Sequence, residues 1–411
     1  MSRSAVAPSH ELVRLIDETL DLEFLEASLI QLVQSPSDVP TGEIAIEPDD
    51  PKIGHYVKEV VQPILEQLQL EKLMVDGLNN LVGSIGPDSS DSSLLMVGYS
   101  VSQHANRMEH PYSGQIASGK EFGRDEPCVF GKGASQNKGA LAALLAALKL
   151  LRDQGLELKG KLFVVLNSEG QSSHRCMEQI FTDNRLMADG GILCVGTGNR
   201  ISLGNRGRVD VYITVRGKSA HSSQPWLGIN AIDGLREVLG RLRDVKLDRD
   251  HPILGKTQLT VYNLACTPSS PHTIPDRCRA IVDRRILPGE DIDSVVDEIR
   301  DAVGELDIGA VDVEMGPYMF PALVDPKHPL VQTLEEGFKG ITGQPAQTFY
   351  PDYTFDAGFP CLAGVPTVMF GPSSWADITL GEEIVQTEFV ALSQVVAAAK
   401  TYAYTILKSL G

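Results

Sequence analysis

The sequence predicts an α/β protein: a domain with a parallel-type sheet covered by helices, interrupted by an inserted α+β domain. Short apolar runs alternate with helical segments up to Gly204, where the pattern changes to half-exposed strands. The alternating style returns after about residue 318. Strands alternating with helices favour a parallel sheet with both faces covered. The expected α/β domain therefore comprises residues 1–204 and 318–411, and the expected insertion residues 205–317.

Elements of the α/β domain are recognised by apolar spacing and by turn residues. Apolar positions at helical spacing occur in residues 8–35 and 52–70. Alanine and leucine dominate residues 133–155, which predicts a strong helix that ends at Gly155. Buried strands are expected at residues 79–86, 93–100, 161–168 and 190–196. Near the C-terminus the sequence predicts a helix at 328–343, a strand at 365–372 and a long final helix.

The expected insertion has a different pattern of apolar and polar residues. Residues 208–218 alternate apolar and polar side chains, which is typical of a strand with one exposed face. Further elements are expected in the order helix 230–244, strands 257–266 and 277–288, helix 291–306 and strand 311–316. This β-α-β-β-α-β order is ferredoxin-like.

Composition excludes several classes of partner and compartment. The 411 residues carry a net charge of -18, which would repel nucleic-acid phosphates, so no nucleic-acid partner is expected. No apolar run is long enough to span a bilayer, so no membrane partner is expected. Six cysteines without CxxC spacing predict reduced thiols, and hence a cytoplasmic protein.

Three stretches, in their order along the chain, resemble the M20 family of metallopeptidases and deacylases. The resemblance lies in residues 110–148, around that family's metal-bridging carboxylate; in residues 215–232, at the opening of its dimerisation domain; and in residues 274–290 together with 365–372. It implies an amide-bond hydrolase that forms a homodimer through the inserted domain and acts on a small-molecule substrate.

The family's chemistry implies two divalent ions held by His and carboxylate ligands. The first His and the Asp two residues later are expected where this sequence has Tyr99 and Val101. The bridging Asp is expected at Gln136, two residues before Lys138.

Later ligand positions differ in the same way. The family's Glu-Glu pair reads Glu169-Gly170, and the next carboxylate is expected at about Val195. The last ligand is a His expected within residues 373–383, yet no histidine follows His328. We therefore expect no metal and no other cofactor. A replacement metal site built from His104, Glu109 and His110 stays an alternative.

The resemblance implies two catalytic residues. Glu169 falls at the general-base position after a buried strand, and the alternative is a solvated loop carboxylate. His221 matches the histidine that reaches across the dimer to polarise the substrate carbonyl, or else it belongs to a turn. A serine nucleophile at Ser172 or Ser173, beside His174, is a further alternative.

Five further residues are candidates for substrate binding. Arg285 matches an arginine that grips the substrate carboxylate, with a strand-surface ion pair as the alternative. His272 occupies a position where the family often has an amide, and is a candidate ligand contact. Tyr99, Gln136 and Asn137 are expected to face the vacated metal cavity, where they orient a ligand or fill space.

Three functions stay open from the sequence. The first is a metal-independent enzyme of this fold, acting on an amide or related C–N bond by hydrolysis, elimination or acyl transfer, with Glu169 as its base. The second is a non-catalytic small-molecule binder. The third is a metallohydrolase with a relocated site.

Overall fold

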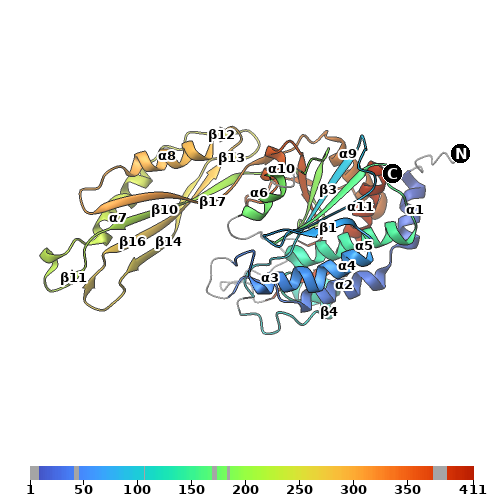
Figure 1. Ribbon diagram of the computed structural model, residues 1–411, viewed down its shortest axis with the longest axis horizontal. Helices are drawn as coiled ribbons and strands as arrows, with labels where there is room; N and C mark the ends of the chain where they lie inside the picture. Colours follow the sequence, from blue (N-terminus) through green and yellow to red (C-terminus); the bar gives the residue numbers. More distant parts are fainter. Residues whose placement is uncertain (1–8, 41–45, 106, 169–173, 183–185, 374–386) are drawn as a thin grey trace. The chain divides into compact units, whose positions relative to one another are not determined.

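The computed structural model describes residues 9–40, 46–105, 107–168, 174–182, 186–373 and 387–411 (Figure 1). It divides into two compact units, each with its own hydrophobic core. The larger unit comprises residues 1–204, 323–351 and 356–411, and we call it the α/β unit. The smaller unit comprises residues 205–322 and 352–355, and we call it the inserted unit. Among the helices described, none is long and apolar enough to cross a membrane.

An eight-stranded mixed sheet forms the centre of the α/β unit. Its strands follow the spatial order β1 (Glu71–Val75), β2 (Leu81–Ile85), β6 (Lys161–Asn167), β3 (Ser93–Tyr99), β7 (Gly191–Cys194), β20 (Thr367–Phe370), β8 (Ile201–Ser202) and β19 (Thr348–Phe349). The four central strands, from β6 to β20, are mutually parallel. The α/β expectation is confirmed for this centre, whereas antiparallel pairing of β1, β2 and β8 makes the sheet mixed.

Helices of the α/β unit pack against this sheet and one another (Figure 1). They are α1 (Ser9–Thr19), α2 (Leu22–Gln34), α3 (Pro51–His55), α4 (Gln62–Gln67), α5 (Gly139–Asp153), α6 (Arg175–Thr182), α9 (Pro329–Thr342), α10 (Gly358–Leu362) and α11 (Leu392–Leu410). Helix α5 packs against α2 and α11, and it is apolar almost all round because it is buried almost all round. Residues Tyr56–Val61 (η1) and Ala134–Lys138 (η3) form π-helical turns, and η3 leads directly into α5.

A small second sheet was not predicted. Its strands are β21 (Phe389–Ala391), β5 (Arg124–Phe130) and β4 (Gln115–Gly119), joined in antiparallel pairs. Three aromatic rings, those of Phe122, Phe130 and Phe389, pack together on it. This sheet ties the segment before α11 to the hairpin that precedes η3.

The inserted unit confirms the ferredoxin-like order. Its sheet has the order β14 (Leu259–Thr267), β16 (Arg277–Ile286), β10 (Gly207–Arg216) and β17 (Ala310–Met319), with every pair antiparallel. Helices α7 (Ala231–Arg243) and α8 (Ile292–Val303) share one apolar core with this sheet. The short pairs β11 (Ala220–His221) with β15 (Thr273–Ile274) and β12 (Asp250–His251) with β13 (Gly255–Lys256) complete the unit. Strand β14 is an edge strand with a largely exposed face.

One expectation about the cysteines is wrong. Cys266 on β14 and Cys278 on β16 stand directly opposite each other, with Cα atoms 4.1 Å apart, and are joined by a disulfide. Cys128, Cys176, Cys194 and Cys361 are not disulfide-bonded, as expected. The pairing depends on strand register, which places residues 12 apart in sequence side by side.

Candidate functional site

The candidate site lies at the carboxyl edge of the parallel strands, where open α/β sheets place their ligands. Tyr99 ends β3, Asn167 ends β6 and Cys194 ends β7. The turn η3 approaches this edge closely: Gly196 donates from its backbone N to the Gln136 carbonyl at 3.0 Å. A Cβ at Gly196 would lie 2.2 Å from the Ser135 carbonyl oxygen, so the approach requires glycine.

A buried phenol, carboxylate and imidazole meet at the end of β3. Tyr99 Oη donates a 2.9 Å hydrogen bond to Asp356 Oδ2. His174 Nδ1 lies 2.6 Å from Asp356 Oδ1. All three residues are buried, with at most 4% of any of them exposed. We call them the Tyr99–Asp356–His174 cluster.

The charge state of the tyrosine in this cluster is set by burial. Desolvation, reinforced by the Asp356 charge, raises the pKa of the Tyr99 phenol well above its usual value. Tyr99 is therefore a neutral hydrogen-bond donor at any physiological pH. Sequence reasoning selected Tyr99 but missed Asp356, which lies 257 residues further along the chain.

The amide side chains of η3 are engaged with neighbouring chain. Asn137 Nδ2 donates to the carbonyls of Tyr99 and Val101, at 2.9 and 3.1 Å. Gln136 accepts from the Gln103 backbone N at 3.0 Å and donates to the Gln103 side chain at 3.3 Å. Both amides thus fix the chain that follows β3, while Asn137 Oδ1 is buried and finds no hydrogen-bond partner among the residues that the structure describes.

Glu388 anchors the same turn from the other side, and sequence reasoning missed it. Its carboxylate accepts from the backbone and hydroxyl of Ser135, both at 3.0 Å, and from the Gln136 backbone at 3.2 Å. Lys132 Nζ lies 2.9 Å from its other oxygen, and both side chains are fully buried. A lone Glu before a short strand gives no sequence signal of this role, because its partners lie about 250 residues earlier.

Lys138 is a second buried cation of this turn. Its Nζ donates to the Ser35 carbonyl at 2.9 Å and lies 5.3 Å from the centre of the Tyr56 ring. Burial lowers the pKa of the Lys138 ammonium to about 7, against the opposing charges of Glu388 and Asp38. Lys138 is therefore poised between its charged and neutral forms near neutral pH.

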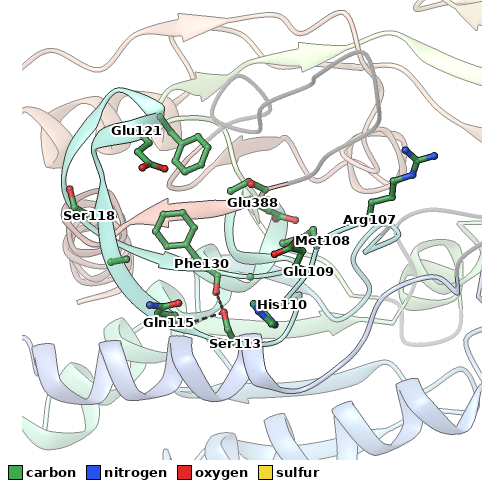
Figure 2. A pocket seen from close by; sticks show the side chains of 14 residues that line it. Arg107, Met108, Glu109, His110, Ser113, Gln115, Ser118, Glu121, Phe130 and Glu388 are labelled. Atoms are coloured by element: carbon green, nitrogen blue, oxygen red, sulfur yellow. Dashed lines mark hydrogen bonds between the residues drawn. The ribbon is translucent and has the colours of Figure 1, made fainter.

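A pocket of about 590 Å³ adjoins Glu388 on the side of the β4–β5 hairpin (Figure 2). Its lining combines charged, hydroxyl and aromatic side chains, among them Glu109, His110, Ser113, Glu121 and Phe130. Figure 2 shows His110 near Ser113 and Gln115, with Arg107 directed away from them.

Two of the three residues weighed as a replacement metal site line this pocket, whereas His104 is not among its lining residues. In the part of the chain that the structure describes, no three His, Cys, Asp or Glu side chains form a group able to hold a metal ion. Nothing described here therefore supports the relocated site.

In the inserted unit, the structure brings two predicted site residues together. The rings of His221 and His272 stack with centres 6.2 Å apart, and both side chains are exposed. His221 Nδ1 accepts from the Ser223 backbone N at 3.2 Å and lies 2.8 Å from the Ser223 hydroxyl. Because Nδ1 is an acceptor, the neutral ring carries its proton on Nε2, which is then free to donate.

Arg285, also in the inserted unit, is held by its own strand. Its Nε and Nη2 lie 2.8 and 3.0 Å from the two carboxylate oxygens of Asp283, and Nη1 donates to Thr354 Oγ at 2.7 Å. The ion pair weighed from the sequence is thus present. A substrate carboxylate would have to replace Asp283 at the Arg285 guanidinium group.

The general-base candidate, Glu169, lies outside the residues that the structure describes, as do Gly170, Ser172 and Ser173. The same holds for residues 374–386, where the last metal-binding histidine of the family was sought. For these positions the assignment stays a prediction from the sequence.

Comparison with known proteins gives the fold and the site a family context. Residues 203–310 match the peptidase dimerisation domain of the M20 type. The uncharacterized protein YgeY of Escherichia coli K12 is 27% identical over 347 residues, which cover 79% of this chain and 82% of that protein. Acetylornithine deacetylase of Klebsiella pneumoniae is 28% identical over 272 residues, or 64% of this chain and 68% of that enzyme.

A solved structure shares the whole fold. The M20 family metallo-carboxypeptidase Sso-CP2 of Sulfolobus solfataricus aligns with a TM-score of 0.74 over 93% of this chain and 98% of that chain, at 18% identity. The chain is therefore a relative of the M20 peptidases and deacylases, and its inserted unit carries a peptidase dimerisation domain of the M20 type.

Proposed function

We propose that this protein hydrolyses an amide or related C–N bond of a small, carboxylate-bearing molecule without a dinuclear metal site. The observation that carries the proposal is the state of Tyr99, which stands where the resemblance places the first metal-binding histidine. Its phenol is buried, neutral and committed as a donor to Asp356. A protonated phenol is not a ligand that divalent ions of this class select.

The neighbouring position supports the same conclusion. Gln136 stands where a metal-bridging carboxylate is expected, and both ends of its amide are hydrogen-bonded to Gln103. A neutral amide supplies no negative charge to offset the dehydration of two cations. The donors at these two positions therefore do not fit a dinuclear site.

In this proposal Glu169 is the general base that takes a proton from the attacking water. His221 donates from Nε2 to the developing oxyanion, consistent with its Nδ1 acting as an acceptor. Arg285 and His272 contact the substrate, with Arg285 exchanging Asp283 for the substrate carboxylate. Tyr99, Gln136 and Asn137 shape the polar floor of the site, and the dimer forms through the inserted unit.

The test combines metal analysis with a substrate panel. Elemental analysis of protein purified without added zinc should show far less than one divalent ion per chain. N-acetyl amino acids and other N-acyl amino acids should be hydrolysed at a rate that chelators leave unchanged. A stoichiometric ion that resists dialysis, together with chelator-sensitive turnover, would restore a metallohydrolase.

Variants then test the base. Glu169→Gln should lower kcat by on the order of 100-fold or more while KM changes little. Glu71→Gln, on the exposed strand β1, is the matched control and should leave kcat unchanged. Ligand binding without turnover on any N-acyl substrate would identify a non-catalytic binder instead, and products of elimination or acyl transfer would identify those reactions.

A further inference from the structure

The pocket beside the β4–β5 hairpin is a cavity that the proposed function does not use. Its volume is about 590 Å³, and sites for small molecules usually measure about 300–1,000 Å³. Of the described residues to which the proposed function gives a role, none lines this pocket. A cavity of this size, lined by charged and aromatic groups, is a candidate for a separate ligand site.

Two carboxylates give the pocket a negative charge. Glu109 lies between β3 and β4, and Glu121 lies in the 3₁₀ turn η2 (Lys120–Phe122) of the hairpin. Both are exposed, and within the ranges that the structure describes neither forms an ion pair or a hydrogen bond. Glu388 also lines the pocket, but its charge is offset by Lys132. The two carboxylates without such an offset favour a cationic ligand.

Two aromatic rings supply an apolar wall. The rings of Phe122 and Phe130 have centres 6.0 Å apart, and each packs on Phe389 at 5.3 Å. This packing fixes the rings, while both residues stay half-buried and line the pocket. Figure 2 shows the Phe130 ring between Glu121 and Glu109. An aromatic face attracts a cation through its negative charge distribution, so rings and carboxylates select the same kind of ligand.

Other classes of ligand fit this lining less well. In the part of the chain that the structure describes, no three His, Cys, Asp or Glu side chains are grouped so that they could hold a metal ion, which excludes the set Glu109, His110 and Glu121. An anion would be repelled by the two carboxylates. Arg107, the cation among the lining residues, points away from the Phe130 ring (Figure 2).

We propose that this pocket binds a small organic cation of the alkylammonium class. Its ammonium group faces the carboxylates of Glu109 and Glu121, and its apolar part packs against Phe122 and Phe130. The site is distinct from the residues of the proposed function. Binding therefore requires neither turnover nor Glu169.

Three compounds of similar shape and different charge test the proposal. They are 2-phenylethylammonium, the neutral 2-phenylethanol and the anion phenylacetate, with affinities measured by calorimetry and binding checked by saturation-transfer NMR. At about pH 8 the amine is protonated and carboxylates are ionised, and about 0.15 M salt screens distant charges. The wild-type protein should bind the cation at least about tenfold more tightly than the alcohol, and phenylacetate most weakly. Equal affinities for cation and alcohol, or no binding of the cation, would overturn the proposal.

Variants locate the binding site. Glu109→Gln/Glu121→Gln should weaken binding of 2-phenylethylammonium by about tenfold or more and leave that of 2-phenylethanol unchanged. Asp125→Asn is the matched control, because it removes an exposed carboxylate of the same hairpin that does not line this pocket. Phe130→Leu should weaken binding of the cation by roughly two- to thirtyfold, and thermal melting checks that this variant is folded.

The remaining outcomes separate this site from the catalytic one and from general attraction to an acidic protein. Glu169→Gln should bind 2-phenylethylammonium as tightly as the wild-type protein, whether or not the proposed hydrolysis is found. Loss of binding in Glu169→Gln would place the compound in the proposed catalytic site instead. Unchanged binding in the double glutamate variant, or an equal loss in Asp125→Asn, would show that the pocket does not recognise the cation.

Discussion

Tyr99 and Asp356 are joined by a hydrogen bond of 2.9 Å from phenol to carboxylate, although 257 residues separate them. The bond connects the end of the central strand β3 to a buried residue that lies two positions before the start of α10. Because this bond gives a hydrogen-bond donor to a carboxylate that has little access to water, its loss should lower both the free energy of unfolding and the activity.

Tyr99→Phe removes only this donor and should lower the free energy of unfolding by about 1.5–3 kcal/mol, the range for hydrogen bonds to charged groups. The urea midpoint of unfolding measures the change. Tyr350→Phe is the control, since Tyr350 is half-buried, and it should cost less than about 0.5 kcal/mol. Equal stability of Tyr99→Phe and the wild-type protein would mean that this bond is absent in solution.

The buried ion pair between Lys132 and Glu388 supports a second stability prediction. Lys132→Met leaves the Glu388 charge without its cation and should destabilise the protein by about 3–5 kcal/mol. Restoring neutrality with the double variant Lys132→Met/Glu388→Gln should recover part of the loss. Lys72→Met is the control, because the ion pair between Lys72 and Asp88 is exposed. This substitution should lower the free energy of unfolding by no more than about 1 kcal/mol. Equal effects of the two single lysine variants would contradict the burial argument.

Because Lys138 is buried, the protein should become more stable as the pH rises above neutrality. Its folded pKa of about 7 lies below the ordinary value of 10.5, so between these values the unfolded chain binds the extra proton. The free energy of unfolding should therefore rise as pH increases from about 7 to about 10.5, by on the order of a few kcal/mol from this group.

The measurement for Lys138 is a difference between two proteins. Denaturant unfolding of the wild-type protein and of Lys138→Met, followed across this pH range, removes the contributions of other titrating groups. Relative to the variant, the wild-type protein should gain stability as pH rises. Parallel pH profiles would show that Lys138 keeps an ordinary pKa.

We propose that the exposed edge strand β14 carries the dimer contact of the inserted unit. Tyr262 and Leu264, two residues apart on this strand, are 52% and 53% exposed and so leave apolar surface on the edge of the sheet. Leu264→Asp should shift the protein from dimer to monomer in light scattering at micromolar concentration. Leu362→Asp changes a leucine of the α/β unit that is 67% exposed, and it should leave the dimer intact. A wild-type protein that is monomeric would refute the assignment.

The cross-strand disulfide predicts a simple labelling result. Alkylation of unfolded protein without reductant should modify four cysteines, and reduction beforehand should raise the number to six. Cys266→Ser should give the same number with and without reduction, because Cys278 then has no partner. Six labels without reductant would show that the pair is reduced.

Local sequence patterns determined which segments form the elements of both units. The alternating residues of β10 and the order of elements after Gly204 predicted a ferredoxin-like insertion, since strands and helices differ in apolar period. The alanine-rich stretch predicted α5 because its residues favour helix and suit a fully buried position. Tyr99, Gln136 and Asn137 were selected because the resemblance places them around the family's metal cavity.

Only the tertiary structure decided which distant side chains meet. Asp356, His174 and Glu388 acquire their roles from partners far away in sequence, and no local period encodes such contacts. The disulfide and the antiparallel edge strands depend likewise on register and pairing between segments, which single-strand patterns do not specify. The sequence by itself therefore determined the elements and the family resemblance, whereas folding created the buried polar cluster, because burial and pairing are properties of the assembled chain.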